Sequence, residues 1–225
     1  MKKAIFFILI LSISLPFVLL LTDVEIATFK LDFYEEKYEE YNIPEVTGIE
    51  MKNLLKVTRE MLDYLKGKRV DLIIITEVNG KDEQVFEERE LLHMIDVKGL
   101  FSQGYIIRNI MLILSMISLG WLVFFQRKAI YKTLIISSLW PMILMIILGM
   151  LMYIDFNKYF NYFHHIFFAN DLWLLDPNTD ILIQMLPLEF FSSMAYKILF
   201  LFAVELLFIL IIGILLKRKA SVIKE

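Results

Sequence analysis

The sequence predicts a mainly α membrane protein with four transmembrane helices and a small extracellular α+β cap. Hydrophobic residues make up 58% of its 225 residues, and the mean hydropathy is +0.64, well above the values of soluble domains. The apolar residues are clustered in long runs rather than spaced periodically along the chain. Four runs come close to about 20 residues, the length that a helix needs to cross a bilayer. These runs are 4–21, 105–125, 133–154 and 198–216.

The positions of positive charges predict how the spans are oriented. Basic residues lie before the first span, between the second and third, and after the fourth: Lys2, Lys3, Arg127, Lys128, Lys132, Lys217, Arg218 and Lys219. Because short basic segments stay in the cytoplasm, both termini are expected there. The long first apolar run, with no small-x-small cleavage site before Thr22, favours a retained anchor over a cleaved signal peptide.

The spans divide the chain into five parts. These are 1–22 (transmembrane helix), 23–104 (extracellular cap and juxtamembrane helix), 105–154 (two transmembrane helices with a short cytoplasmic loop), 155–197 (extracellular loop) and 198–225 (transmembrane helix and basic cytoplasmic tail). The apolar run 181–188 is too short to span. It is expected to lie along the interface or to fold back into the bundle.

The cap carries signals for both helices and strands. Alternating residues over 26–33 predict a strand that leaves the first span, and apolar residues at helical spacing predict a helix over 51–65. A β-branched run at 70–78 ends at Asn79 and Gly80, a pair typical of a type I′ hairpin. The return strand is expected at 84–86.

Composition excludes several classes of function. The net charge is −3, and no basic stripe is interleaved with aromatic residues, so nucleic acid is not a predicted partner. The absence of cysteine removes disulfides, thiolate nucleophiles and cysteine metal sites together. No GxSxG motif is present, and Ser192 and Ser193 lie in no nucleophile elbow. Acid–base catalysis by histidine is therefore the chemistry for which the chain has candidates.

All three histidines of the chain are predicted on the same side of the membrane. His93 lies in a juxtamembrane helix expected at 87–101, three residues before Asp96, so that both side chains share a face. His164 and His165 point about 100° apart on a helix, so at most one of them faces a site. A solvated helix face and an interfacial aromatic belt are the ordinary explanations. The convergence of three histidines at one depth favours a functional site instead.

Metal binding and sensing are the alternatives to acid–base catalysis. His93 and His164 with Asp171 or Asp176 offer metal donors, although no HExxH motif is present. A metal-dependent lipid hydrolase is therefore one alternative, and chelation would abolish its activity. A non-enzymatic membrane sensor or accessory subunit is another, in which the histidines respond to pH or ligand.

Two segments resemble the signature blocks of a known family. HMIDVKGLF at 93–101 and FHHIFFANDLWLLDPNTDILIQMLPLEFF at 163–191 are similar to blocks of the lipoprotein intramolecular transacylases, integral membrane proteins of Gram-positive bacteria. The resemblance includes the topology, and it is weak only over the cap at 23–86. The family patterns HMxDV and FHxxFF fall on His93, Met94, Asp96, Val97, Phe163, His164, Phe167 and Phe168. The second pattern favours His164 over His165.

The resemblance implies a reaction and a substrate. The family moves the sn-2 acyl chain of a diacylglyceryl-modified lipoprotein onto the α-amino group of the same N-terminal cysteine, which leaves a lyso-form lipoprotein. No cofactor is implied, and the partners are lipoproteins and membrane lipid. We hypothesise that His164 deprotonates the amine and His93 helps to protonate the leaving oxygen, or the reverse. His165 remains a further catalytic candidate.

Other polar residues are assigned supporting roles. Asp96 with Asp171 or Asp176 would orient the imidazoles, and Asn170 would stabilise an oxyanion or form an ordinary turn. Charged residues inside membrane spans usually have a functional role, so Arg108 and Glu205 are expected to pair or to bind substrate. The aromatic Trp173 is expected to bind substrate. The predicted site residues are thus His93, His164, His165, Asp96, Asn170, Asp171, Asp176, Arg108, Trp173 and Glu205.

Overall fold

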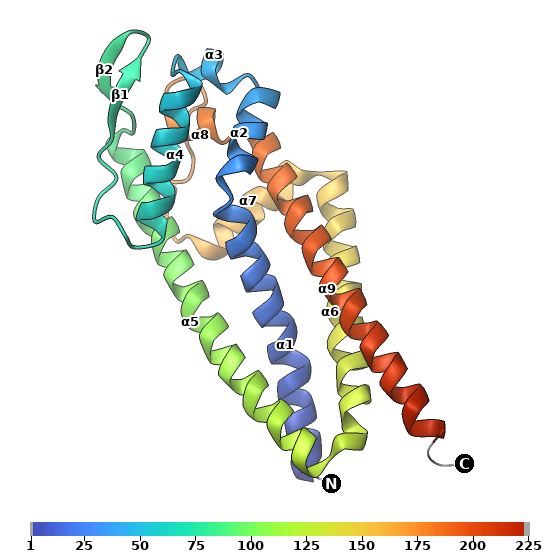
Figure 1. The fold of residues 1–225 in the computed structure, drawn as a ribbon. Coiled ribbons are helices and arrows are strands. Elements are labelled where there is room, and N and C mark those ends of the chain that lie inside the picture. The colour runs from blue at the N-terminus through green and yellow to red at the C-terminus, as the bar shows by residue number, and fades with distance from the viewer. Residues whose placement is uncertain (1, 223–225) are drawn as a thin grey trace. The chain divides into compact units, whose positions relative to one another are not determined.

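The computed structural model describes residues 2–222, and Figure 1 shows their fold. The elements follow one another as α1 (Lys2–Thr28), α2 (Leu31–Glu40), α3 (Ile43–Thr47), α4 (Met51–Leu65), β1 (Ile75–Val78), β2 (Lys81–Gln84), α5 (Glu88–Phe125), α6 (Arg127–Ile154), α7 (Phe156–Phe167), α8 (Ile181–Met185) and α9 (Leu188–Val222). They form two compact units, called here the spanning unit and the cap unit.

The spanning unit contains the chain up to Glu25, Gly104–Ile154 and the chain from Tyr196 onward. Among the described residues, α1, α5, α6 and α9 are the four helices long and apolar enough to cross a membrane (Figure 1). The prediction of a four-helix membrane protein is therefore confirmed. Many apolar side chains on these helices are exposed, Ile143 and Phe208 among them, as contact with lipid requires.

Small and polar residues join the helices of the spanning unit. The hydroxyl groups of Ser14 and Ser115 are 2.7 Å apart, and the Trp140 indole donates to the Ser12 carbonyl at 2.9 Å. A Cβ atom on Gly213 would lie 2.9 Å from Ile135, so α9 approaches α6 closely only because glycine stands there. Such contacts hold membrane helices together, since lipid removes the hydrophobic drive for association.

The cap unit comprises Ile26–Gln103 and Asp155–Ala195. Its core is built from aromatic and aliphatic side chains of α2, α4, the start of α9 and the segment just before α5. They include Tyr34, Tyr38, Leu54, Met61, Phe86 and Phe190. α4 confirms the helix predicted over 51–65 and buries the predicted apolar face. The Tyr38 hydroxyl lies 2.7 Å from that of Thr58, which satisfies both groups inside this core.

The hairpin is confirmed, with a shorter first strand and an earlier return strand than predicted. β1 occupies only the end of the run 70–78, and β2 pairs with it so that Val78 lies opposite Lys81. Asn79 and Gly80 both have positive φ, 50° and 81°, as the type I′ turn requires. The return strand therefore begins immediately after the two-residue turn, rather than at residue 84.

The predicted strand over 26–33 is wrong. α1 continues to Thr28 and α2 begins at Leu31, so the segment is helical on both sides of Phe29 and Lys30. The aromatic ring of Phe33 packs against Phe190, 5.5 Å between centroids, as part of a helix face. Alternation over eight residues did not separate a strand from the junction of an apolar spanning helix with a second helix.

Candidate active site

His93 and His164 meet inside the cap unit. His93 lies on the first part of α5, before the apolar span 105–125, and His164 lies on α7. Their ring centroids are 6.2 Å apart, and the side chains are only 8% and 7% exposed. His165 is exposed, and its ring lies nearly perpendicular to that of Trp173, with 5.1 Å between the ring centroids. Of the two adjacent histidines, His164 is therefore the one that faces His93.

The neutral tautomer of His164 follows from its hydrogen bond. Nδ1 lies 2.8 Å from the carbonyl oxygen of Phe160, one turn earlier on α7. Because a carbonyl oxygen only accepts, Nδ1 carries the proton and Nε2 presents its lone pair. The His164 ring contacts two aromatic rings. Its centroid lies 4.4 Å from that of Phe160 and 4.7 Å from that of Trp173, which stacks on it with an interplanar angle of 26°. His164 is thus oriented as a proton acceptor.

His93 has a buried nitrogen atom with no protein partner. Its Nδ1 is without a hydrogen bond to any of the described residues, and its ring meets that of Phe168 edge to face at 5.4 Å. Burial lowers the pKa of His93 to about 4, and the neighbouring His164 adds to this effect, while Asp96 opposes it. His93 is therefore neutral at physiological pH.

Burial also lowers the pKa of His164. The positive charge of His165 lowers it further, whereas the hydrogen bond to the Phe160 carbonyl favours the protonated ring and raises it. Both imidazoles of the pair are thus neutral at pH 7. A neutral imidazole with a free Nε2 is the form that a general base needs.

Asn170 ties the loop after α7 to α5. Its Nδ2 donates to Asp96 at 2.9 Å, and its Oδ1 accepts from the amide of Leu172 at 3.0 Å. Arg89, on the same helix as Asp96, donates to the carbonyl oxygen of Asp171 at 2.6 Å. Both ends of the Asn170 amide are used in these contacts. They hold the loop that carries Trp173.

Asp176 forms a local turn away from the imidazoles. Its Oδ1 accepts from the backbone and side-chain nitrogen atoms of Asn178, at 2.9 and 2.8 Å, and these bonds lower the pKa of Asp176. The amide of Asp176 itself donates to Asp180 at 2.8 Å. Within residues 2–222 no carboxylate is hydrogen-bonded to His93 or His164, so an orienting role for Asp171 or Asp176 stays a prediction.

The two charged residues predicted inside spans do not pair with each other. Arg108 forms an ion pair with Glu25, and the carboxyl group of Glu205 contacts that of Asp23. These four side chains belong to the spanning unit, whereas the two histidines belong to the cap unit. The alternative that Arg108 pairs with Glu205 is therefore wrong, and the alternative that they bind substrate stays a prediction.

Glu90 is a buried site residue that the sequence reasoning missed. It is fully buried, with Oε2 accepting from the amide of Glu87 and Oε1 from the amide of Leu182, both at 2.6 Å. The first bond caps the start of α5. The second joins α8 to α5 at Glu90, about one helical turn before His93. Burial raises the pKa of Glu90 to about 7 although both amide bonds oppose this. The signal in the sequence was a glutamate at the third helical position.

Replacement of Glu90 by alanine is expected to destabilise the protein by about 2 to 4 kcal/mol, because two buried amides lose their acceptor. Glu88→Ala, at an exposed position on the same turn, is the control and should change the melting temperature little.

The pKa of Glu90 is higher in the folded protein than in the unfolded chain. Its ionisation therefore makes stability fall as pH rises from about 4.5 to about 7. Melting temperatures in detergent across this range should fall less for Glu90→Gln than for the wild type; equal slopes would contradict the assignment.

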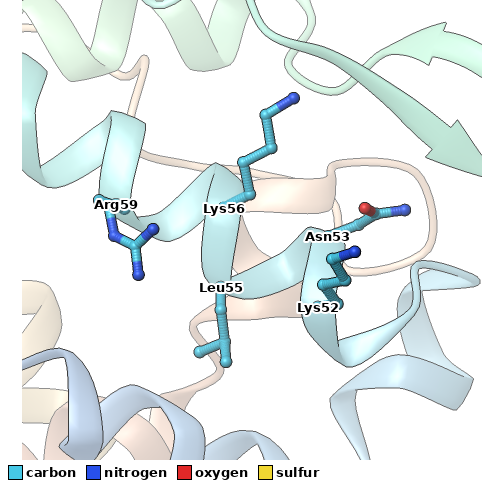
Figure 2. A pocket seen from close by; sticks show the side chains of 5 residues that line it. All are labelled: Lys52, Asn53, Leu55, Lys56 and Arg59. Carbon is cyan, nitrogen blue, oxygen red and sulfur yellow. The ribbon is translucent and has the colours of Figure 1, made fainter.

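Other features of the cap unit do not form a competing site. In the described part of the chain no group of three or more His, Asp or Glu side chains is placed to hold a metal ion. A depression on α4 is lined by Lys52, Asn53, Leu55, Lys56 and Arg59, none of them a predicted site residue (Figure 2). Figure 2 shows these side chains projecting from a single helix rather than converging.

Comparisons with known proteins agree with this architecture. The family model of the lipoprotein intramolecular transacylase Lit matches residues 9–191. An uncharacterized protein of Aquifex aeolicus (strain VF5) is 31% identical over 211 residues, which cover 91% of this chain and 93% of that protein. The membrane-integral lipoprotein intramolecular transacylase Lit of Bacillus cereus superposes with a TM-score of 0.86 at 22% identity, over 98% of this chain and 99% of that one. A variant of it with a histidine replaced by alanine gives 0.81 at 21% identity, over 98% and 96%.

Proposed function

Because the chain belongs to the lipoprotein intramolecular transacylase family, we propose that it moves the sn-2 acyl chain of a diacylglyceryl-modified lipoprotein to the α-amino group of the same molecule. The product is a lyso-form lipoprotein. The observation that carries the proposal is the buried pair of neutral imidazoles, His93 and His164, in the cap unit. No acyl-enzyme is required, because amine and ester belong to one substrate and are already close together.

The transfer requires two proton movements around one new bond. The α-ammonium group first loses a proton to solvent by way of His164, since its reference pKa is about 7.7 to 8.0. The amine nitrogen then attacks the ester carbonyl carbon, and the carbonyl oxygen takes the negative charge. When the oxyanion collapses, the bond from the acyl carbon to the glycerol oxygen breaks. The nitrogen loses a second proton, and the glycerol oxygen gains one.

The two histidines divide this work. His164 is the base, because its Nδ1–H is fixed on Phe160 and its Nε2 lone pair is free. His93 takes a proton from the His164 imidazolium and then gives it to the glycerol oxygen, so both rings return to the neutral form. The lowered pKa values of both histidines favour this return. Asp96 stabilises the charged form of His93 during the transfer.

The site is proposed to lie at the outer interface of the membrane, with both termini in the cytoplasm. The basic residues of the short 125–133 connection and of the C-terminal segment support this orientation. On α7, exposed Tyr162, Phe163 and Phe167 form an aromatic surface around the buried His164. Such residues favour the headgroup level, where a lipoprotein presents its glycerol ester.

Tandem mass spectrometry of a lipopeptide tests the proposal. The purified protein in liposomes is given a synthetic diacylglyceryl-cysteine lipopeptide, and protein-free liposomes are the control. The expected product has the same mass, an N-acyl group and an S-monoacylglyceryl group. Release of free fatty acid that a chelator abolishes would instead support a metal-dependent hydrolase. An unchanged lipopeptide with folded protein would contradict the proposal and favour a sensor.

A further inference from the structure

A buried indole N–H next to His164 has no partner in the folded protein. Trp173 is 9% exposed, and its Nε1 is buried without a hydrogen bond to any residue within 2–222. Nearly all buried polar groups in folded proteins are paired, so a buried and unpaired donor calls for an explanation. An acceptor that arrives with the substrate supplies one.

Trp173 is held in a fixed position against the catalytic pair. Its indole stacks on His164, and the edge of the ring contacts His165. The loop before it is tied to α5 by the hydrogen bond from Asn170 to Asp96. A donor held in this way undergoes little reorganisation during a reaction, which is the property that makes oxyanion stabilisation effective.

The reaction leaves one polar atom to be accounted for. The proposed transfer involves an amine nitrogen, a glycerol oxygen and a carbonyl oxygen. His164 serves the nitrogen and His93 the glycerol oxygen, so the carbonyl oxygen still lacks a donor. Asn170, the residue expected from the sequence to fill this role, is exposed, and its amide group already donates to Asp96 and accepts from Leu172. Trp173 Nε1 is a buried donor in the same cluster that has no partner among residues 2–222.

We propose that Trp173 is a further catalytic residue, whose indole N–H donates to the carbonyl oxygen of the migrating acyl group and stabilises the oxyanion. This inference rests on the proposed transacylation. As the C–N bond forms, the carbonyl π electrons move to the oxygen, and the indole N–H bonds this oxyanion without giving up its proton. When the bond to the glycerol oxygen breaks, the carbonyl is restored.

Trp173→Phe tests the role of the N–H while it keeps an aromatic ring on His164. Loss of one oxyanion donor should lower kcat by about 10²-fold to 10³-fold, with KM changed by less than about threefold. Trp140→Phe is the matched control, because its indole donates to Ser12 in the spanning unit. That variant should keep its kcat. An unchanged kcat in Trp173→Phe would overturn the inference.

Thermal stability separates this role from a structural one. Both variants lose ring volume, but the Trp173 N–H is unpaired in the free protein, so Trp173→Phe should lower the melting temperature less than Trp140→Phe does. Trp140→Phe, which loses an existing hydrogen bond, should melt lower. A fall in kcat accompanied by a comparable loss of folded Trp173→Phe protein would contradict the inference, since a packing role would explain both.

A substrate analogue tests the hydrogen bond directly. An N-acetylated diacylglyceryl lipopeptide keeps the ester carbonyl but has no free amine, and its sn-2 ether counterpart lacks the carbonyl. The indole proton resonance of Trp173, identified by its absence in Trp173→Phe, should move downfield with the ester and not with the ether. Equal effects of the two analogues would overturn the inference. If the wild-type protein converts the reactive lipopeptide while Trp173→Phe loses no activity, only this inference fails; if the wild type is inactive, the proposed function fails.

Discussion

His164→Ala is expected to lower the rate of acyl transfer by about 10³-fold or more, whereas His165→Ala should retain activity within about threefold. Loss of a positioned general base costs about 10²-fold to 10⁴-fold. His164 also stacks on Trp173 and donates from Nδ1 to the Phe160 carbonyl oxygen, so its removal leaves the centre of the cluster empty. His165 is exposed and lies at the edge of the site.

The same assay distinguishes the two members of the pair. His93→Ala should reduce kcat by a comparable factor, because the leaving oxygen then lacks its proton donor. Initial rates of lipopeptide conversion in liposomes measure each variant, and melting temperatures show whether it is folded. If His165→Ala were inactive and His164→Ala active, the assignment from burial would be wrong. Activity in both His93→Ala and His164→Ala would remove histidine catalysis from the account.

The histidine limb of the pH profile is expected below pH 6.5, the ordinary pKa of histidine, in addition to the limb of the substrate amine at about 7.7 to 8.0. Burial lowers the pKa of His164, so this base stays neutral and active as pH falls past 6.5. Protonation at lower pH removes the lone pair on Nε2, and activity is then lost. The lowered pKa of His164 is that of the free enzyme, and the profile of kcat/KM reports groups in the free enzyme, which makes it the quantity to measure.

Two variants should shift the histidine limb of this profile without changing the pKa of the substrate amine. In His165→Ala the neighbouring positive charge is gone, so the pKa of His164 rises and the histidine limb should move to higher pH. In Asp96→Asn the favourable negative charge is gone, so the pKa of His93 falls further. If His93 set the limb, this second variant would move it to lower pH. A limb unmoved by either substitution would show that the histidine pair does not control the pH dependence.

The sequence predicts the elements of this protein better than their partners. Apolar runs of spanning length and the Asn79–Gly80 pair are local signals, and the structure contains the helices and the hairpin that they predict. The convergence of His93 and His164 was also predicted, because both precede or follow a span on the same side. Topology is enough to place such residues at the same side of the bundle, and the structure then shows that their rings meet.

Pairing between distant helices could not be predicted in the same way. Arg108 contacts Glu25 rather than Glu205, and Glu90 reaches the amide of Leu182, 92 positions along the chain. Each contact depends on how a helix is rotated about its axis and on where a loop returns. Neither is encoded in hydropathy or spacing. The unpaired Trp173 Nε1 likewise becomes visible only when its surroundings are known.

A crossover experiment with labelled lipopeptides tests the central claim most directly. One diacylglyceryl lipopeptide carries heavy isotopes in both its peptide and its acyl chains, and a second carries none. The protein is incubated with an equal mixture of the two in liposomes, and the N-acylated products are identified by tandem mass spectrometry. Intramolecular transfer predicts heavy peptide bearing only heavy acyl chains and light peptide bearing only light ones. Mixed products, or no N-acylated peptide at all, would contradict the account.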